Sequence, residues 1–110
     1  MSVERPPHAW LIDARAYALE AQRIAVGQVL VRRDLLAIRY CLMALGEALY
    51  WVPEAMLASE PAIPWRKVIA LRHRLVHGYW LIDEEIIVEI ARNEIEPLVS
   101  TLTRPIDKFA

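Results

Sequence analysis

The chain has 110 residues, 56% of them hydrophobic, and a net charge of −1, so it is long enough for one domain with a single core. The near-neutral charge excludes a uniformly basic nucleic-acid binder, and the lone cysteine, Cys41, excludes an intrachain disulfide and a cysteine metal cluster. So high a hydrophobic content favours burial of some apolar surface against a second copy. Neither a signal peptide nor a membrane span is predicted, and a cytoplasmic protein is expected.

Two long helices are predicted in the first half of the chain. The first covers about residues 9–27, where apolar side chains recur every three or four positions. The second covers about residues 31–52, is apolar on nearly every face, and ends at Pro53. We therefore expect it to be the central helix. Its charged residues Arg39 and Glu47 each need a partner there, and one interpretation is a buried ion pair between them.

Two further helices follow a proline-rich connection, residues 53–64, that has room for one short helical turn. The third helix starts near Pro64 and runs to about residue 77, where Gly78 is expected to take the left-handed conformation. Asp83 is the predicted N-cap of the fourth, and Pro97 could kink it. No stretch alternates with period two. The predicted fold is all-α, an antiparallel four-helix up-and-down bundle with a short extra helical turn.

Charge is distributed unevenly along the second half of the chain. Residues 63–80 carry a net charge of +4, whereas residues 81–100 carry −5. An anionic ligand would be attracted to the first segment and repelled by the second. The acidic run is interpreted as a solvated face, or as a docking surface for a basic partner. The cations of the basic segment are candidate phosphate-binding residues: Arg66, Lys67, Arg72 and Arg74.

The basic segment also contains His73 and His77, four positions apart on one helix face. RNA can be cleaved without a metal when a base removes the proton of its 2′-hydroxyl and a cation stabilises the charge on the phosphorus. Histidine supplies the first function and an arginine such as Arg72 the second. One such histidine gives half of an acid–base pair, so a symmetric homodimer would complete the site.

Residues 72–79 read RHRLVHGY, and this R-x4-H-x-Y pattern resembles the motif of HepT-like toxins, ribonucleases of the HEPN superfamily. The flanking sequence is similar to that family as well. Residues 38–48 parallel its I-R-N-L-x-x-I-G-E-A helix, and residues 63–66 match its I-P-W-R entry to the motif helix. An acidic pair, Asp83 and Glu84, opens the last helix as in the family. The resemblance covers about residues 10–102.

The resemblance implies a HEPN-like helical homodimer that acts as a metal-independent endoribonuclease toxin on tRNA or mRNA, without a cofactor. Its catalytic pair would be Arg72 and His77, with the site in the dimer cleft. The partner would be a cognate minimal nucleotidyltransferase antitoxin, and Tyr79 would be the tyrosine that this antitoxin modifies with AMP. The remaining matched positions are supporting residues of the site or interface: His73, Arg39 and Glu47. Tyr40 departs from the usual asparagine.

Within this interpretation, residues 9–103 form the helical domain, residues 1–8 a flexible lead and residues 104–110 a C-terminal tail. The main alternative function is a non-catalytic HEPN module that binds a nucleotide or a partner protein. A structural dimer without activity is a third possibility.

Simpler roles exist for the individual residues. Tyr79 can be a packing aromatic, and so can each of the four tryptophans. His77 can be a helix-capping histidine and Arg72 a solvated arginine. His73 and His77 have the spacing of two metal ligands, but no third ligand is apparent and no metal site is predicted.

Overall fold

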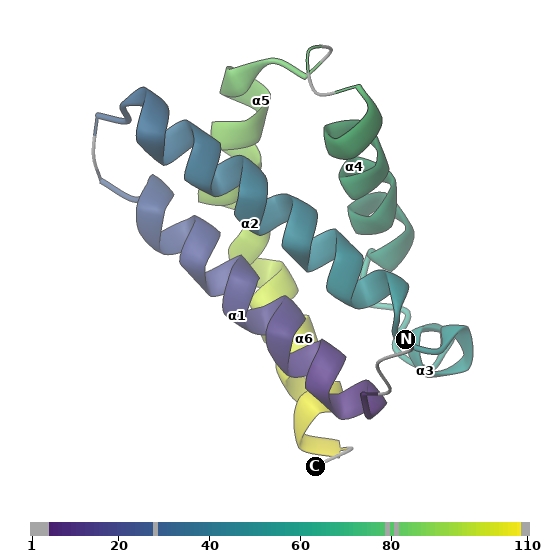
Figure 1. Ribbon diagram of the computed structural model, residues 1–110. Coiled ribbons are helices and arrows are strands. Elements are labelled where there is room, and N and C mark those ends of the chain that lie inside the picture. The colour runs from purple at the N-terminus through teal and green to yellow at the C-terminus, as the bar shows by residue number, and fades with distance from the viewer. Residues whose placement is uncertain (1–4, 28, 79, 81, 109–110) are drawn as a thin grey trace.

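The computed structural model describes residues 5–27, 29–78, 80 and 82–108, and this part of the chain contains helices and no strand, as predicted. Four long helical segments follow in the predicted order (Figure 1). The last of them changes its helical type along its length. The elements are α1 (Pro7–Ala25), α2 (Arg32–Tyr50), α3 (Glu54–Ala58), α4 (Trp65–His77), α5 (Glu84–Glu89), the π-helical η2 (Ile90–Glu94) and α6 (Ile95–Lys108).

Helices α1 and α2 begin and end within two residues of the predicted positions. Helix α1 starts at Pro7, because a proline in the first helical turn has no N–H that would need a partner there. After α1 the chain turns at Gly27, whose φ of +72° is accessible to glycine at little cost. The short helical turn expected before the third helix is α3.

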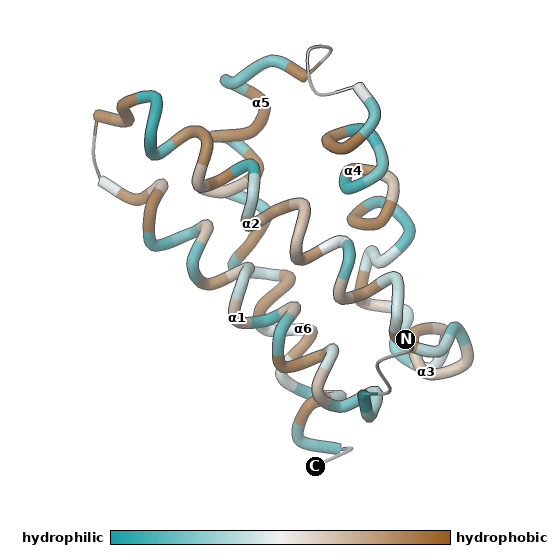
Figure 2. Tube along the Cα trace, in the orientation of Figure 1, coloured by the Kyte–Doolittle hydropathy of each residue, from teal (hydrophilic) through white to brown (hydrophobic). Residues whose placement is uncertain are grey.

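Helix α2 lies at the centre of the molecule, as its all-round hydrophobicity predicts. It contacts α1, α4 and α5, while α1 also packs against α6. Apolar segments recur along these helices in the hydropathy-coloured trace (Figure 2). Cys41 packs among the core residues, and burial raises the pKa of its thiol. Helix α1 contributes small side chains that permit close approach of its neighbours: Ala14, Ala18, Ala21 and Ala25. None of the helices in the described part of the chain could span a membrane.

The fourth predicted helix contains a π-helical turn, η2, shortly before Pro97. Pro97 has no N–H to donate to the carbonyl of Asn93, and its ring would crowd that carbonyl in a regular α-helix. The wider turn immediately before the proline relieves this crowding. Within η2, Arg92 Nε donates a hydrogen bond of 2.8 Å to the carbonyl oxygen of Ala25 at the end of α1.

The ends of the connection between α4 and α5 differ in how well they were predicted. Asp83 is the N-cap of α5, accepting a hydrogen bond of 3.0 Å from the Glu85 N–H, as expected. The left-handed conformation expected at Gly78 is wrong, because its φ is −148°. Its N–H donates to the Arg74 carbonyl at 2.8 Å, so the last turn closes in the ordinary α-helical pattern without a left-handed residue.

Candidate functional site

Helix α4 presents one side to α2 and the opposite side to solvent. Leu75 is buried, and Val68 and Leu71 are packed against the core, which is the inward row that the spacing predicts. The histidines His73 and His77 are exposed. The helix therefore displays its polar chemistry on a rigid support, held by apolar contacts to α2.

Gly46 of α2 sets how closely α4 approaches. A Cβ at position 46 would overlap the Cβ of Arg72 and lie 2.9 Å from the carbonyl oxygen of Val68. Because carbon and oxygen atoms cannot approach so closely without strain, any larger side chain would push the two helices apart. The absence of a side chain at Gly46 thus places Arg72 directly against α2.

Arg72 forms an ion pair with Glu47, the residue that follows Gly46. The distance from its Nη2 to Glu47 Oε2 is 2.6 Å, and the two side chains are 27% and 39% exposed. Glu47 also accepts a hydrogen bond of 2.9 Å from the indole Nε1–H of Trp51. The Nε–H of Arg72 is buried without a hydrogen-bond partner. Glu47 therefore orients the guanidinium, and this ion pair does not use all of its five N–H donors.

The interpretation of Arg39 and Glu47 as an ion pair is wrong. Arg39 instead donates a hydrogen bond of 2.9 Å from Nη2 to the carbonyl oxygen of Ile82. The two residues are eight positions apart, and Glu47 is next to the close contact that brings in Arg72. Arg39 thus ties α2 to the segment that enters α5, about two turns of α2 from Glu47.

His73 and His77 lie one helical turn apart, with ring centroids separated by 4.6 Å and ring planes tilted by 49°. Arg72 and His77 are five positions apart, which is roughly 140° around an α-helix. Arg72 accordingly faces α2 while His77 points outward. Among the described residues, no three histidine, cysteine, aspartate or glutamate side chains gather in a way that could hold a metal ion. Tyr79 lies outside the described residues.

The other predicted cations are spread along α4. Arg66, at its first turn, lies over the Trp65 ring at 4.7 Å and is 3.8 Å from Glu54. Arg74 lines a shallow cavity with His73 on the outer face. Arg74 and Lys67 also border a mostly apolar cavity of about 360 Å³ between α4 and the last helical segment. The structure therefore groups Arg74 with His73, but Arg66 and Lys67 lie more than one turn from Arg72.

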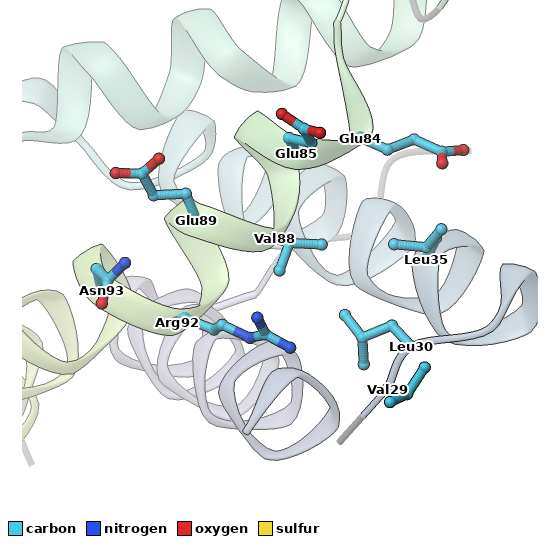
Figure 3. A pocket seen from close by; sticks show the side chains of 9 residues that line it. All are labelled: Val29, Leu30, Leu35, Glu84, Glu85, Val88, Glu89, Arg92 and Asn93. Carbon is cyan, nitrogen blue, oxygen red and sulfur yellow. The ribbon is translucent and has the colours of Figure 1, made fainter. Parts of the chain in front are cut away.

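A larger cavity, about 640 Å³, lies elsewhere, between the α1–α2 connection and the last helical segment. Three carboxylates, those of Glu84, Glu85 and Glu89, stand around it, with Val88 and Leu35 among its apolar walls (Figure 3). The excess of negative charge opposes binding of a polyanion such as RNA. Cavity size therefore does not identify an RNA-binding site in this molecule.

Two residues that matter to the geometry have no role assigned from the sequence: Gly46 and Tyr50. A glycine within an otherwise apolar helix indicates that another helix packs closely there, but it does not predict which helix that is. The sequence favours core or dimer packing for Trp51. The ring is not part of the core of the single chain, because Trp51 is 55% exposed and hydrogen-bonded to Glu47.

Residues 16–104 match the family model described as "Ribonuclease HepT-like". The chain belongs to the HepT-like ribonuclease family. The resemblance based on the R-x4-H-x-Y motif and its flanks is thereby confirmed. All the residues of α2 and α4 discussed above lie within the matched region.

Among similar proteins, "Putative RNase MJ0127" of Methanocaldococcus jannaschii is 36% identical over 59 residues, which cover 54% of this chain and 49% of that protein. "Probable ribonuclease HepT" of Thermococcus cleftensis is 29% identical over 62 residues, covering 56% of each chain. The chain spans about half the length of these curated relatives. No solved structure matches the chain at a significant level.

Proposed function

We propose that this HepT-like chain is a metal-independent endoribonuclease and the toxin of a toxin–antitoxin pair. The observation that carries the proposal is the Arg72–Glu47 ion pair, which holds a guanidinium in a fixed position on the helix that also presents the exposed His77. Family membership supports RNA as the substrate class. Arg72 would bind the scissile phosphate and stabilise its developing charge, and His77 would transfer protons.

In the proposed reaction, the 2′-oxygen of RNA attacks the neighbouring phosphorus while His77 accepts the proton of the 2′-hydroxyl. The bond from phosphorus to the 5′-oxygen of the next nucleotide breaks, and that oxygen is protonated by a second group as it leaves. The products are a 2′,3′-cyclic phosphate and a 5′-hydroxyl. The reaction needs a donor and an acceptor of protons but no redox partner and no metal-bound water.

A homodimer would supply the second proton-transfer group. The outer face of α4 carries His73 and His77 together with exposed apolar side chains, Val76 and, just beyond the helix, Trp80. Exposed apolar side chains beside polar ones are typical of protein interfaces. We propose that two HEPN-like antiparallel four-helix up-and-down bundles pair across this face, so that two copies of His77 and Arg72 border one cleft.

The remaining parts of the proposal rest mainly on family membership. A cognate minimal nucleotidyltransferase would be the antitoxin, with Tyr79 as its AMP acceptor, and both proteins would act in the cytoplasm. The helical domain would extend beyond the expected residues 9–103, because the helices run from Pro7 in α1 to Lys108 in α6. Arg39 would support the site through its hydrogen bond to Ile82, and Arg66, Lys67 and Arg74 would contact RNA at other phosphates.

The function is tested by incubating the purified chain, with Tyr79 unmodified, with bulk tRNA and mRNA in excess EDTA. We expect cleavage that leaves 2′,3′-cyclic phosphate and 5′-hydroxyl ends, and a substrate with a 2′-deoxynucleotide at the scissile position should resist cleavage. Sedimentation should show a dimer. Cleavage that requires added metal would contradict the mechanism, and RNA binding without cleavage would favour a non-catalytic HEPN module.

A further inference from the structure

Two aromatic side chains at the C-terminal end of α2 are unusually exposed for their size. Tyr50 is 57% exposed and Trp51 is 55% exposed. Their rings meet edge to face, with centroids 5.4 Å apart and planes at 86°. Beneath them, the ring of Trp10 stacks on that of Trp51, with centroids 6.2 Å apart and planes at 23°. We call Tyr50, Trp51 and Trp10 the aromatic shelf.

The aromatic shelf is held in a fixed relation to Arg72. The indole Nε1–H of Trp51 donates to Glu47, and Glu47 binds the guanidinium of Arg72. The guanidinium carbon of Arg72 also lies 6.0 Å from the centroid of the Tyr50 ring, at the outer limit of a cation–π contact. A single carboxylate therefore orients both the cation and the neighbouring indole.

Core packing does not account for Tyr50 and Trp51, because more than half of the accessible surface of each residue remains open to solvent in the folded chain. Exposed aromatic rings beside a fixed cation have a specific use in nucleic-acid binding. A base stacks on the ring while its phosphate contacts the cation, and stacking accepts every base because each has a π-face. The second copy of the chain is the other occupant that such rings fit, and the test below distinguishes it.

We propose that the aromatic shelf binds an unpaired base of the substrate next to the phosphate held by Arg72. The proposal rests on the proposed ribonuclease function and makes the substrate single-stranded at the site of cleavage. Bases within a duplex already stack on their neighbours, so a double-stranded segment could not place a base on Tyr50 or Trp51 without being opened. The charge supports this placement, since Arg72 lies beside the aromatic shelf, whereas the cavity bordered by three glutamates is formed by other elements.

The test measures binding separately from cleavage. Every chain carries His77→Ala so that the RNA is not cleaved during the measurement. Fluorescence anisotropy measures the affinity of each chain for a labelled eight-nucleotide oligouridylate and for a labelled RNA duplex. Tyr50→Ala and Trp51→Ala should each weaken binding of the oligouridylate by about tenfold. Tyr50→Phe keeps the ring and should bind within about twofold of its parent. The duplex should bind more weakly than the single strand to the parent.

Three results would contradict the proposal that the aromatic shelf binds a base. The first is unchanged affinity in both alanine variants, and the second is failure of the His77→Ala parent to bind the oligouridylate at all. The third is loss of affinity together with dissociation into monomers by sedimentation, because the rings would then belong to an interface between copies. Failure of the proposed function gives a different result. If a chain with His77 intact binds the oligouridylate but does not cleave RNA, the base-binding role of the aromatic shelf stands and the ribonuclease function is contradicted.

Discussion

Replacing Arg72 by alanine is expected to slow RNA cleavage by roughly 10²–10³-fold, the usual effect of removing one preorganised donor from a transition state. The guanidinium is fixed by Glu47 at 2.6 Å, so little of its freedom remains to be lost when a phosphate binds. Arg72→Lys should recover only part of the rate, since an ammonium cannot present the planar pair of donors. Single-turnover cleavage of a defined oligoribonucleotide measures both variants.

A matched control is Arg23→Ala, which removes an exposed arginine of α1 whose ion pair with Glu20 lies within one helix. This variant should cleave at the parental rate, because an exposed pair of this kind contributes little to stability. A similar loss of rate in Arg23→Ala and Arg72→Ala would show that general positive charge, rather than a positioned guanidinium, is what the reaction needs.

Replacing Gly46 by alanine is expected to lower the free energy of unfolding by about 1–3 kcal/mol, the usual cost of overpacking. The added methyl group would overlap the Cβ of Arg72 and approach the carbonyl oxygen of Val68, so α4 must move away from α2. That movement should also displace Arg72 from Glu47. We therefore expect slower cleavage even where the variant is fully folded. Urea denaturation measures the stability, and single-turnover cleavage below the transition measures the rate.

Gly27→Ala is a control that lowers the stability of the chain without changing the position of Arg72. Gly27 has a φ of +72°, and a Cβ added there would have no atom within 4 Å, so alanine costs about 1–2 kcal/mol through backbone strain alone. The variant should be destabilised to a similar extent yet cleave at the parental rate at temperatures where it is folded. Equal loss of rate in the two variants would mean that Gly46 acts only through stability.

The elements that follow from local patterns were predicted well. Helical periodicity predicts the ends of α1 and α2 to within two residues of their observed positions. The all-round hydrophobicity of α2 predicts its central position, and the predicted N-cap of α5, Asp83, is confirmed. The structure differs from the prediction at Gly78 and has an unpredicted turn before Pro97, two places where more than one backbone conformation can satisfy the local hydrogen bonds. A π-helical turn precedes Pro97, and Gly78 ends α4 by an ordinary hydrogen bond. Such choices depend on the packing around the helix as well as on the residue itself.

The candidate site was only partly predictable for a different reason. The spacing of residues 72–79 indicates which side chains carry chemistry, but it does not show which residue of another helix meets them. Arg39 and Glu47 are both charges in an apolar helix, and nothing in the sequence pairs Glu47 with Arg72. The contact depends on the close approach permitted by Gly46. Distances between helices, not periodicity along them, determine such pairs.

The most direct measurement is the rate of RNA cleavage in EDTA by the parent chain and by His77→Ala, with His8→Ala as a control. His8 lies on α1, where its Nε2 is 2.8 Å from the carbonyl oxygen of Ile106, far along the chain from the motif. We predict that His77→Ala remains folded and dimeric but cleaves at least about 10²-fold more slowly, while His8→Ala keeps the parental rate. A parental rate in His77→Ala would contradict the assignment of His77 to proton transfer.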